Sequence, residues 1–272
     1  MSMRAAVLSG LLLFAAAAGI AAEPAPVVAT RSMTMLNGVA ATPGKAPFAD
    51  GELLTHELYF RFLTVGTGTM SVDKGVSYDG QPAIHLSGAV SASAFGLTSM
   101  AGANDSWIDP TGLFSLGFVT DQDGPKVDDR EEWRLDNTKA IATRDRVRKK
   151  GDAPETASHK EYALAKTHVQ DVFSMLYFFR AFPVKVGDVL ESDVYVSKKL
   201  WSLKFRVVKR ENVKVPAGKF ACLKVVPEIT RDGEKAQSGQ VTVWVTDDAQ
   251  KIPVKIWTAT KFGKLEAALL RK

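Results

Sequence analysis

The sequence predicts a mainly β protein, in which a strongly curled antiparallel sheet, a barrel-like meander, wraps one apolar helix near residues 169–182. Two observations support this prediction. Over most of the chain, apolar and polar residues alternate with a period of two, as they do in strands that bury one face. The stretch Val172–Phe182 differs, because only Ser174 and Arg180 in it are polar. A helix that is apolar on every side is expected to be buried in protein.

Residues 1–22 have the pattern of a secretory signal peptide. Arg4 precedes an apolar run, Ala5–Ile20, and small residues follow it, so we expect cleavage after Ala21 or Ala22. The run is short for a membrane span and the residues after it are polar, although a retained N-terminal anchor is the alternative. We therefore expect a soluble mature protein in the periplasm of a Gram-negative bacterium, without a transmembrane segment.

Two segments are expected after the leader. Residues 23–47 hold several prolines and few large apolar side chains, which predicts a linker or a loosely attached arm. Residues 48–272 are predicted to form a single β-rich domain. Cys222 is the only cysteine and lies far from the leader, so we expect neither an internal disulfide nor a lipoprotein. The domain must therefore be stabilised by its apolar core.

The domain is expected to begin with a strand in which Leu58 and Phe60 alternate with Tyr59 and Arg61. Turn clusters such as Ser-Tyr-Asp-Gly-Gln-Pro and Asp-Gln-Asp-Gly-Pro separate the runs that follow. Further strands are predicted before the helix at residues 66–73, 82–94, 104–109, 113–121, 128–136 and 138–146. In the first of these runs, the glycines at positions 66 and 68 are expected to relieve crowding or to bend the strand.

The predicted helix has suitable ends. Asp171 lies in its first turn and Arg180 in its last, where their charges complement the helix dipole. Pro183 then stops the helix. A second run of strands follows, in which Trp201 begins a period-two pattern and Pro216 opens the turn of a hairpin. We therefore expect one β meander before the helix and another after it.

The C-terminal hairpin carries apolar residues on both of its faces. One face is aliphatic (Val241, Val243, Val245, Ile252, Val254 and Ile256). When these two sets are paired across the turn, Trp244 and Trp257 become diagonal neighbours on the other face. A sheet with one face in water would not show this pattern, so something must cover the second face. The simplest arrangement is a curled sheet that has the apolar helix as its plug.

Several motifs along the chain occur together in one bacterial family. They are an Asp-x-x-Ser-x-Leu-Tyr helix that runs into Val-Gly-Asp, a Pro-Ala-Gly-x-Phe-x-Cys hairpin, and Trp-x-Thr-Asp-Asp followed by Pro253. Over residues 47–270 the chain thus resembles an exported family known as domain of unknown function 3108. The resemblance implies a periplasmic β protein, similar in style to curled-sheet carriers of lipids and lipoproteins. It implies no catalytic residues.

Sequence motifs for catalysis and metal binding are absent. The four histidines lack a His-Glu-x-x-His spacing, one cysteine cannot build a thiolate zinc site, and no Gly-x-Ser-x-Gly occurs. The carboxylates at 128–132 are interpreted as a solvated strand edge and those at 247–248 as a hairpin turn. The net charge is +5, but the densest basic run, 144–150, lacks interleaved aromatic residues and is interpreted as a solvated loop. We expect no cofactor, metal or nucleic-acid partner.

These observations favour a non-enzymatic periplasmic protein of the cell envelope, whose curled sheet binds an apolar ligand such as a lipid or an acyl chain. The residues expected to line its site are aromatic: Tyr177, Phe178, Trp201, Trp244 and Trp257. The first alternative is a fully packed envelope scaffold, or a domain that binds an envelope protein partner. The second is an enzyme of unknown class. Carrier and scaffold differ in whether the space beside the helix is empty enough for a ligand.

Overall fold

The computed structural model describes residues 29–94, 98–124, 127–231, 234–235, 241–260 and 263–272. The predicted leader, residues 1–22, lies outside this part of the chain. Most described residues are in strands, and a single helix, α2 (Ser174–Arg180), interrupts them. For the described residues, the prediction of a mainly antiparallel β protein with one helix is confirmed.

Before the helix, long strands follow one another in a meander. They are β4 (Leu53–Phe60), β5 (Leu63–Tyr78), β6 (Gln81–Ala94), β7 (Thr98–Ile108), β8 (Ser115–Asp123), β9 (Val127–Asp136), β10 (Ile141–Lys150) and β11 (Thr156–Ala163). Each strand pairs antiparallel with the next one along the chain. Each strand run predicted before the helix thus overlaps an observed strand.

A second meander follows the helix. Its strands are β13 (Val189–Val196), β14 (Lys199–Val215), β15 (Gly218–Arg231), β16 (Glu234–Lys235), β17 (Val241–Thr246), β18 (Pro253–Thr260) and β19 (Gly263–Arg271). The last strand, β19, pairs with β4, so the two meanders form one sheet. Within this second meander, β15 pairs with β14, with the short β16 and with β17.

Four short strands complete the structure: β1 (Thr30–Arg31), β2 (Met35–Leu36), β3 (Val39–Ala40) and β12 (Lys166–Thr167). Strand β2, in the segment predicted to be an arm, pairs with β13 and with β3. Strands β1 and β12 form a separate parallel pair. The ladders of the large sheet therefore run in the order β11-β10-β9-β8-β7-β6-β5-β4-β19-β18-β17-β15-β14-β13-β2-β3.

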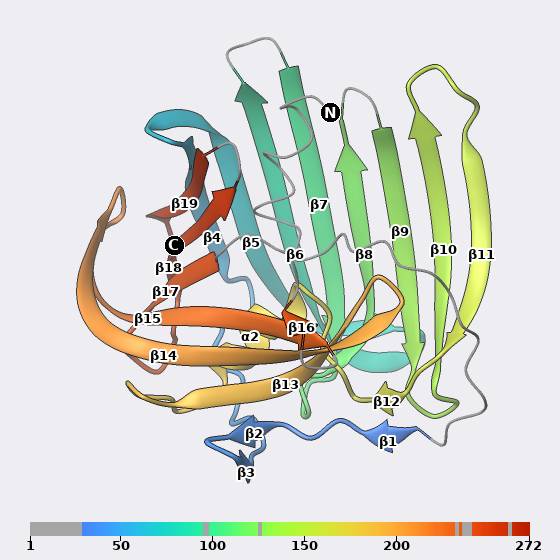
Figure 1. Ribbon diagram of the computed structural model, residues 1–272, viewed down its shortest axis with the longest axis horizontal. Coiled ribbons are helices and arrows are strands. Elements are labelled where there is room, and N and C mark those ends of the chain that lie inside the picture. Colours follow the sequence, from blue (N-terminus) through green and yellow to red (C-terminus); the bar gives the residue numbers. More distant parts are fainter. Residues whose placement is uncertain (1–28, 95–97, 125–126, 232–233, 236–240, 261–262) are drawn as a thin grey trace.

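The sheet has two arms that run in different directions. We call β5–β11 the N-terminal arm and β13–β15 the C-terminal arm. Figure 1 shows the strands of the N-terminal arm standing side by side, while those of the C-terminal arm run across them. Helix α2 lies between the arms (Figure 1), and side chains from both arms pack around it in one core cluster.

The prediction of a strongly curled sheet is wrong, because the sheet does not close: ladders through β4, β19, β18 and β17 join the two arms at one side. Among the described residues, no ladder pairs β11 with β13. The irregular segment 169–170 instead links β8 to β13. The N–H of Ser115 in β8 donates to the carbonyl of Val169 at 2.9 Å, and the N–H of Gln170 donates to the carbonyl of Asp193 in β13 at 3.0 Å.

The same segment explains why α2 is shorter than the predicted helix. Residues 169–170 use their backbone groups to join β8 to β13, so they cannot also begin a helix. Asp171 caps the first turn: its Oδ1 accepts the N–H groups of Phe173 and Ser174 at 2.8 and 2.9 Å. Its Oδ2 accepts the hydroxyl of Ser106 in β7 at 2.5 Å. Asp171 therefore stands just before the helix rather than within its first turn as predicted, and its negative charge there still complements the helix dipole.

The basic run 144–150 is not the solvated loop that we expected. It lies in β10, beside the acidic residues of β9, and β9 is an interior strand rather than a sheet edge. The register places Arg146 opposite Glu131 and Arg148 opposite Asp129. Arg146 binds Asp129 with two hydrogen bonds, and Arg148 lies 3.3 Å from the same carboxylate. The basic run of β10 and the acidic run of β9 therefore form ion pairs with each other across the two strands.

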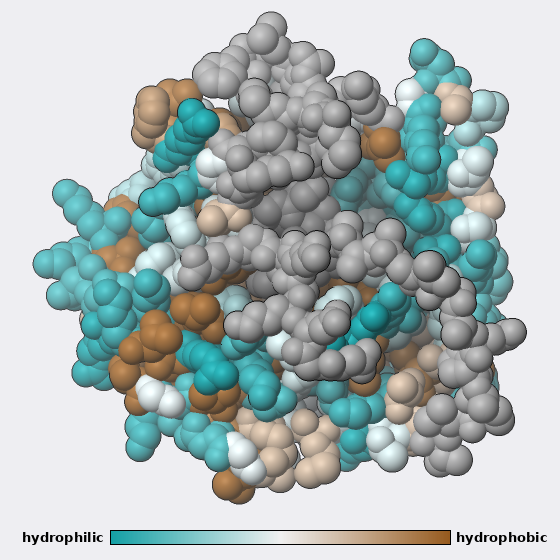
Figure 2. All heavy atoms as spheres, in the orientation of Figure 1, coloured by the Kyte–Doolittle hydropathy of each residue, from teal (hydrophilic) through white to brown (hydrophobic). Residues whose placement is uncertain are grey.

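Two apolar clusters form the interior. The larger one surrounds α2, and the smaller one contains Phe118, Trp133, Leu135, Ala142, Leu164, Val169 and Tyr195. At the open end of the N-terminal arm, β11 is exposed along nearly its whole length. Figure 2 shows hydrophilic side chains gathered on that side of the molecule, over β10 and β11. Charged end strands of this kind hinder pairing with other chains.

Candidate functional site: an apolar pocket beside the helix

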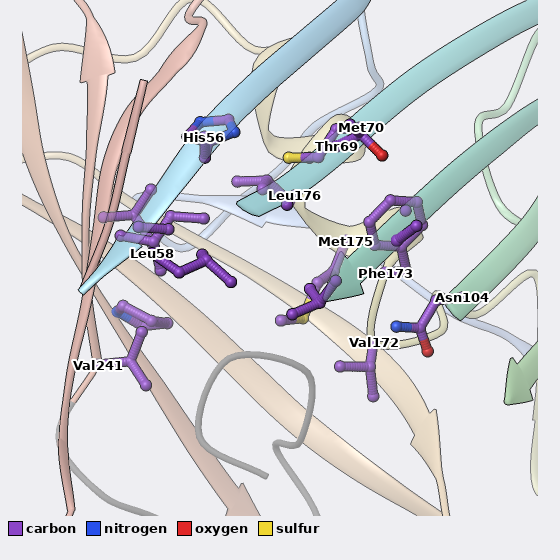
Figure 3. Close-up of a pocket in the computed structure, with 18 of the residues that line it drawn as sticks. His56, Leu58, Thr69, Met70, Asn104, Val172, Phe173, Met175, Leu176 and Val241 are labelled. Carbon is purple, nitrogen blue, oxygen red and sulfur yellow. The ribbon is translucent and has the colours of Figure 1, made fainter. Parts of the chain in front are cut away.

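A pocket of about 130 Å³ lies beside α2, between the helix and the sheet (Figure 3). Nearly all of its lining is apolar. Strands β4, β5, β6 and β7 line one side, and β14, β15, β17, β18 and β19 line the other. The main lining residues are His56, Leu58, Gly68, Met70, Gly88, Val90, Asn104, Val172, Phe173, Met175, Leu176, Phe205, Pro227, Val241, Val243, Ile256 and Ala267. The pocket therefore needs residues from almost the whole length of the domain.

The helix contributes a distinct apolar face to this pocket. Val172, Phe173 and Leu176 line it, and each of them is only partly buried. Positions four apart, such as 172 and 176, lie on the same side of a helical turn. The other large apolar residues of α2 are buried, including Met175, Tyr177 and Phe179. The expectation that this helix is buried therefore holds for α2 except at its pocket face.

Two glycines of the facing strands shape the pocket wall. At Gly88, an added Cβ would lie 2.7 Å from the ring of Phe173, so only glycine lets this ring approach β6 so closely. At Gly68, an added Cβ would meet its neighbours at ordinary distances of 3.5–3.7 Å. The expected relief of crowding is instead found at Gly66, where a Cβ would lie 1.9 Å from the carbonyl oxygen of Ser91. Gly68 thus leaves space that a side chain would fill.

The polar groups at the pocket carry no charge at pH 7. His56 is buried, and its Nε2 donates a hydrogen bond of 2.9 Å to the carbonyl oxygen of Pro253. Burial lowers the pKa of His56 below its usual value, so its ring is neutral. Asn104 of β7 is the second buried polar residue. Figure 3 shows its amide directed toward the region of Val172 and Phe173. In the part of the chain that the structure describes, no Lys, Arg, Asp or Glu belongs to the lining.

The aromatic residues of α2 that the sequence singled out are packed into the core. Tyr177 contacts Phe48 edge to face, with ring centroids 5.3 Å apart. Phe178 contacts Phe182 in the same way at 5.0 Å. Neither Tyr177 nor Phe178 is among the residues that line the pocket. Their side chains hold the helix in place rather than facing the empty space.

The three predicted tryptophans lie outside the pocket: Trp201 of β14 packs against the core cluster around α2, and Trp244 and Trp257 lie on the face of the C-terminal hairpin that is turned away from the pocket. Trp244 is opposite Lys255 and Trp257 is opposite Thr242, so the two are diagonal neighbours as predicted. The aliphatic face of this hairpin, with Val241, Val243 and Ile256, lines the pocket instead. None of the three tryptophans (Trp201, Trp244 and Trp257) is a lining residue of this pocket.

Charged side chains, rather than the helix, cover the tryptophan face. The indole N–H of Trp244 donates to Glu211 at 2.7 Å, and the ammonium group of Lys224 lies 5.4 Å from the centre of its ring. The ammonium group of Lys264 lies 5.5 Å from the ring of Trp257. Lysine stems are apolar and their ends are charged, so they can shield a ring from water while they remain solvated.

A buried ion pair at the end of α2 was missed by the sequence reasoning. The side chain of Arg180 is fully buried and binds both carboxylate oxygens of Glu52, at 2.7 and 2.8 Å. Its Nε also donates to the carbonyl of Gln250 at 2.9 Å. The signal in the sequence was an arginine within an apolar helix, which must find a partner if it is buried. The pocket residues Gly68, Gly88 and Asn104 were also missed.

Neither a metal centre nor a membrane-crossing helix is found in the described part of the chain. Among those residues, no group of three or more His, Cys, Asp or Glu side chains could hold a metal ion. Within the same ranges, no helix has the length and apolar character needed to cross a membrane. Cys222 is a free, buried thiol, and burial raises its pKa to about 11.

The fold and the site define a class: an antiparallel β protein with a single buried helix and an apolar pocket against that helix. The family model described as "Protein of unknown function (DUF3108)" matches residues 55–269. The chain therefore belongs to this family, and the resemblance noted in its motifs is confirmed. No curated protein matches the chain.

Three solved structures are similar over most of the chain. A β-barrel-like DUF1849 protein from Brucella abortus is 9% identical with a TM-score of 0.49, and the match covers 80% of this chain and 95% of that one. A candidate exported protein with a YmcC-like fold from Bacteroides fragilis is 15% identical (TM-score 0.30, coverage 84% and 98%). A candidate lipoprotein from Parabacteroides distasonis is 12% identical (TM-score 0.32, coverage 85% and 99%).

Proposed function

We propose that this protein is a non-enzymatic binding protein of the cell envelope that holds part of an apolar, lipid-like ligand in the pocket beside α2. One observation carries the proposal. In a helix whose other large apolar residues are buried, Val172, Phe173 and Leu176 keep part of their surface free toward an apolar pocket. Apolar surface that stays accessible in a concave site gains free energy when an apolar ligand covers it.

The size of the pocket limits what it holds. Typical small-molecule sites have about 300–1,000 Å³, whereas this pocket has about 130 Å³. An engineered apolar cavity of about 150 Å³ in another protein binds benzene. The pocket therefore suits a short apolar group, such as the end of an acyl chain. Met70 and Met175 line it, and flexible methionine side chains can adjust to a longer group.

The location forms part of the proposal. The leader-like residues 1–22 support export to the periplasm, followed by cleavage of the leader. The chain would then act as a soluble envelope protein, with residues 48–272 as one domain preceded by the arm at 23–47. Its sole cysteine, Cys222, is buried in β15 and lies far from the leader in sequence, which supports the proposal that no lipid is attached. Sequencing the N-terminus of the exported protein tests this, because an uncleaved leader would contradict it.

A series of fatty alcohols of increasing chain length tests the binding proposal. Each methylene that enters the pocket should contribute about 0.8 kcal/mol, or roughly a fourfold gain in affinity. The gain should stop when the chain outgrows the pocket. Isothermal titration calorimetry measures the affinities, and a rise in melting temperature with ligand concentration checks them. If no alcohol in the series binds saturably, the protein is better described as a packed scaffold.

A glycine substitution tests whether binding occurs in this pocket. Gly68→Ala adds a methyl group that has ordinary contact distances to the surrounding atoms, so the protein should fold. The methyl group would occupy pocket space and should weaken binding of the longest alcohols. The matched control is Gly124→Ala, which lies outside the pocket and also has ordinary contacts. Equal losses in both variants would show that the ligand binds elsewhere.

The aromatic residues predicted from the sequence provide a second comparison. If Trp257 lines a binding surface, Trp257→Ala should weaken binding of the alcohols more than it lowers stability. If the ligand occupies the pocket beside α2, Trp257→Ala should leave the affinity unchanged, because Trp257 is not part of that lining. We expect the second result. The titration of this variant therefore separates the two possible locations of the ligand within the same sheet.

A further inference from the structure

Asn104 is an exception among the polar residues that face the helix. It is 9% exposed and lines the apolar pocket, and no hydrogen bond joins its side chain to another described residue. Its neighbour on the same face of β7, Ser106, donates to Asp171. Gln170, also buried, uses its amide N–H to bind the carbonyl of Leu113 at 3.0 Å. Asn104 is not among the residues with fully buried, unpartnered side-chain atoms, so its amide is accessible from the pocket and can bind a molecule there.

The direction of the Asn104 side chain suggests that its partner is a ligand. Figure 3 shows it extending from β7 into the space beside Val172 and Phe173. The remaining polar lining residues are not equivalent to it. His56 already donates to Pro253, and Thr69 lies between Gly68 and Met70, which line the inner face, so it projects to the other face of β5. Asn104 is thus the polar group best placed to bind a ligand within the pocket.

The charges around the pocket restrict the chemistry of that ligand. Among the described residues, no lysine or arginine lines the pocket, and His56 is neutral. The buried carboxylate of Asp171 is occupied by two backbone N–H groups and the Ser106 hydroxyl. A carboxylate, a phosphate or an ammonium group would therefore lose its hydration here without gaining a counter-charge, which is strongly unfavourable. A neutral polar group avoids this cost.

We infer that the pocket selects an apolar ligand that carries one uncharged hydrogen-bonding group, an alcohol, ester or amide, which binds the side chain of Asn104. This rests on the proposed function. The asparagine amide has two donor hydrogens and an acceptor oxygen, so it can pair with either a hydroxyl or a carbonyl group. The apolar lining binds the chain and Asn104 fixes the depth at which the polar group lies. A saturated hydrocarbon would leave the amide unpaired.

The test compares ligands that share one chain and differ in their end group: octane, octanol, methyl octanoate, octanoate and octylammonium, at neutral pH. For the unmodified protein, octanol and methyl octanoate should bind about three- to tenfold more tightly than octane, the usual gain from one neutral hydrogen bond. Octanoate and octylammonium should bind more weakly than octanol. Calorimetric titration, or competition against a bound fluorescent alcohol, measures all five affinities.

Two variants test whether Asn104 causes the preference for octanol over octane. Asn104→Leu, of similar size, should bind octane and octanol equally, and Asn104→Ala serves if the leucine variant does not fold. The matched control, Asn212→Leu, changes an exposed asparagine of β14 outside the pocket and should retain the preference for octanol.

The outcomes separate this inference from the proposed function. If octane binds the unmodified protein as tightly as octanol, or if Asn104→Leu keeps the preference, the inference is wrong while apolar binding stands. Tightest binding of octanoate would likewise overturn it. If none of the five ligands binds, the proposed function itself fails.

Discussion

The two faces of the α2 region have the same apolar character but very different surroundings. Tyr177 and Phe179 pack against rings from the sheet, with centroids 5.3 Å from Phe48 and 4.9 Å from Phe205. On the pocket face, the ring of Phe173 lies against Gly88 of β6, and most of the side chains that line the space beside it are aliphatic. This difference shows that the size of the side chains on the facing strands determines whether an apolar helix face is packed in the core or lines a pocket. Substitutions on the two faces should therefore have different effects.

The largest loss is expected on the packed face. Phe179 is buried and in contact with Phe205, so Phe179→Ala would leave a cavity that the surrounding strands cannot fill. We expect it to lower the free energy of unfolding by about 3–5 kcal/mol, the usual range for a buried Phe→Ala change. Urea denaturation followed by circular dichroism measures this. A loss below about 1 kcal/mol would show that this face is not packed as described.

The buried ion pair should show a loss of similar size. Glu52→Leu leaves the guanidinium of Arg180 buried without its partner, which typically costs about 3–5 kcal/mol. The double variant Glu52→Leu/Arg180→Met removes both charges and should recover a large part of that loss. Equilibrium denaturation of the two proteins makes the comparison. If the double variant is less stable than Glu52→Leu alone, the hydrogen bond from Arg180 to the carbonyl of Gln250 stabilises the fold even without Glu52.

A smaller loss is expected on the pocket face. If Phe173 and Leu176 were fully buried, as the apolar sequence of the helix predicts, Phe173→Ala and Leu176→Ala would each cost about 2–5 kcal/mol. Because Leu176 is partly exposed to the pocket, we now expect Leu176→Ala to cost less than about 2 kcal/mol. The same denaturation experiment as for Phe179→Ala applies. Equal losses at positions 176 and 179 would contradict the distinction between the two faces.

The smallest effect is a dependence on pH. Burial lowers the pKa of His56 in the folded protein, while in the unfolded chain it stays near its ordinary value of about 6.5. The unfolded state therefore binds more protons below that value, and the contribution of His56 to stability is lost as the pH falls through it. We expect the loss between pH 7 and pH 5 to be smaller in His56→Gln. Identical pH profiles for the two proteins would count against a neutral, buried His56.

Local patterns in the sequence predicted the elements well. The period-two alternation placed the strands, and it correctly made Trp244 and Trp257 diagonal neighbours. The apolar stretch located the helix, but its start at Ser174 depends on hydrogen bonds from residues 169–170 to β8 and β13. Those partners are distant in the sequence, so no local pattern reports them. The same holds for the acidic residues of β9 that pair with the basic run of β10.

The pocket was harder to predict because it depends on positions where the facing strands have no side chain. Its volume arises where Gly68 and Gly88 face the helix, and neither residue differs in the sequence from a glycine that bends a strand. The aromatic residues chosen from composition are large enough to line a site. Trp244 nevertheless lies on the face that Lys224 and Glu211 cover. The face of a strand that is turned inward can be predicted only when the arrangement of the whole sheet is known.

The pairing of β4 with β19 has a consequence for how the protein forms. Leu58 is opposite Ala267, so β4, which pairs with β5 along one edge, finds the partner for its other edge only in the last strand, β19. Contacts between such distant parts of a chain slow folding, because a large loop must close before they form. The pocket is lined by both residues, so its wall stays incomplete until the C-terminal strand has paired with β4. The pocket is thus among the last parts of the molecule to be completed, and loss of β19 would leave it open on one side.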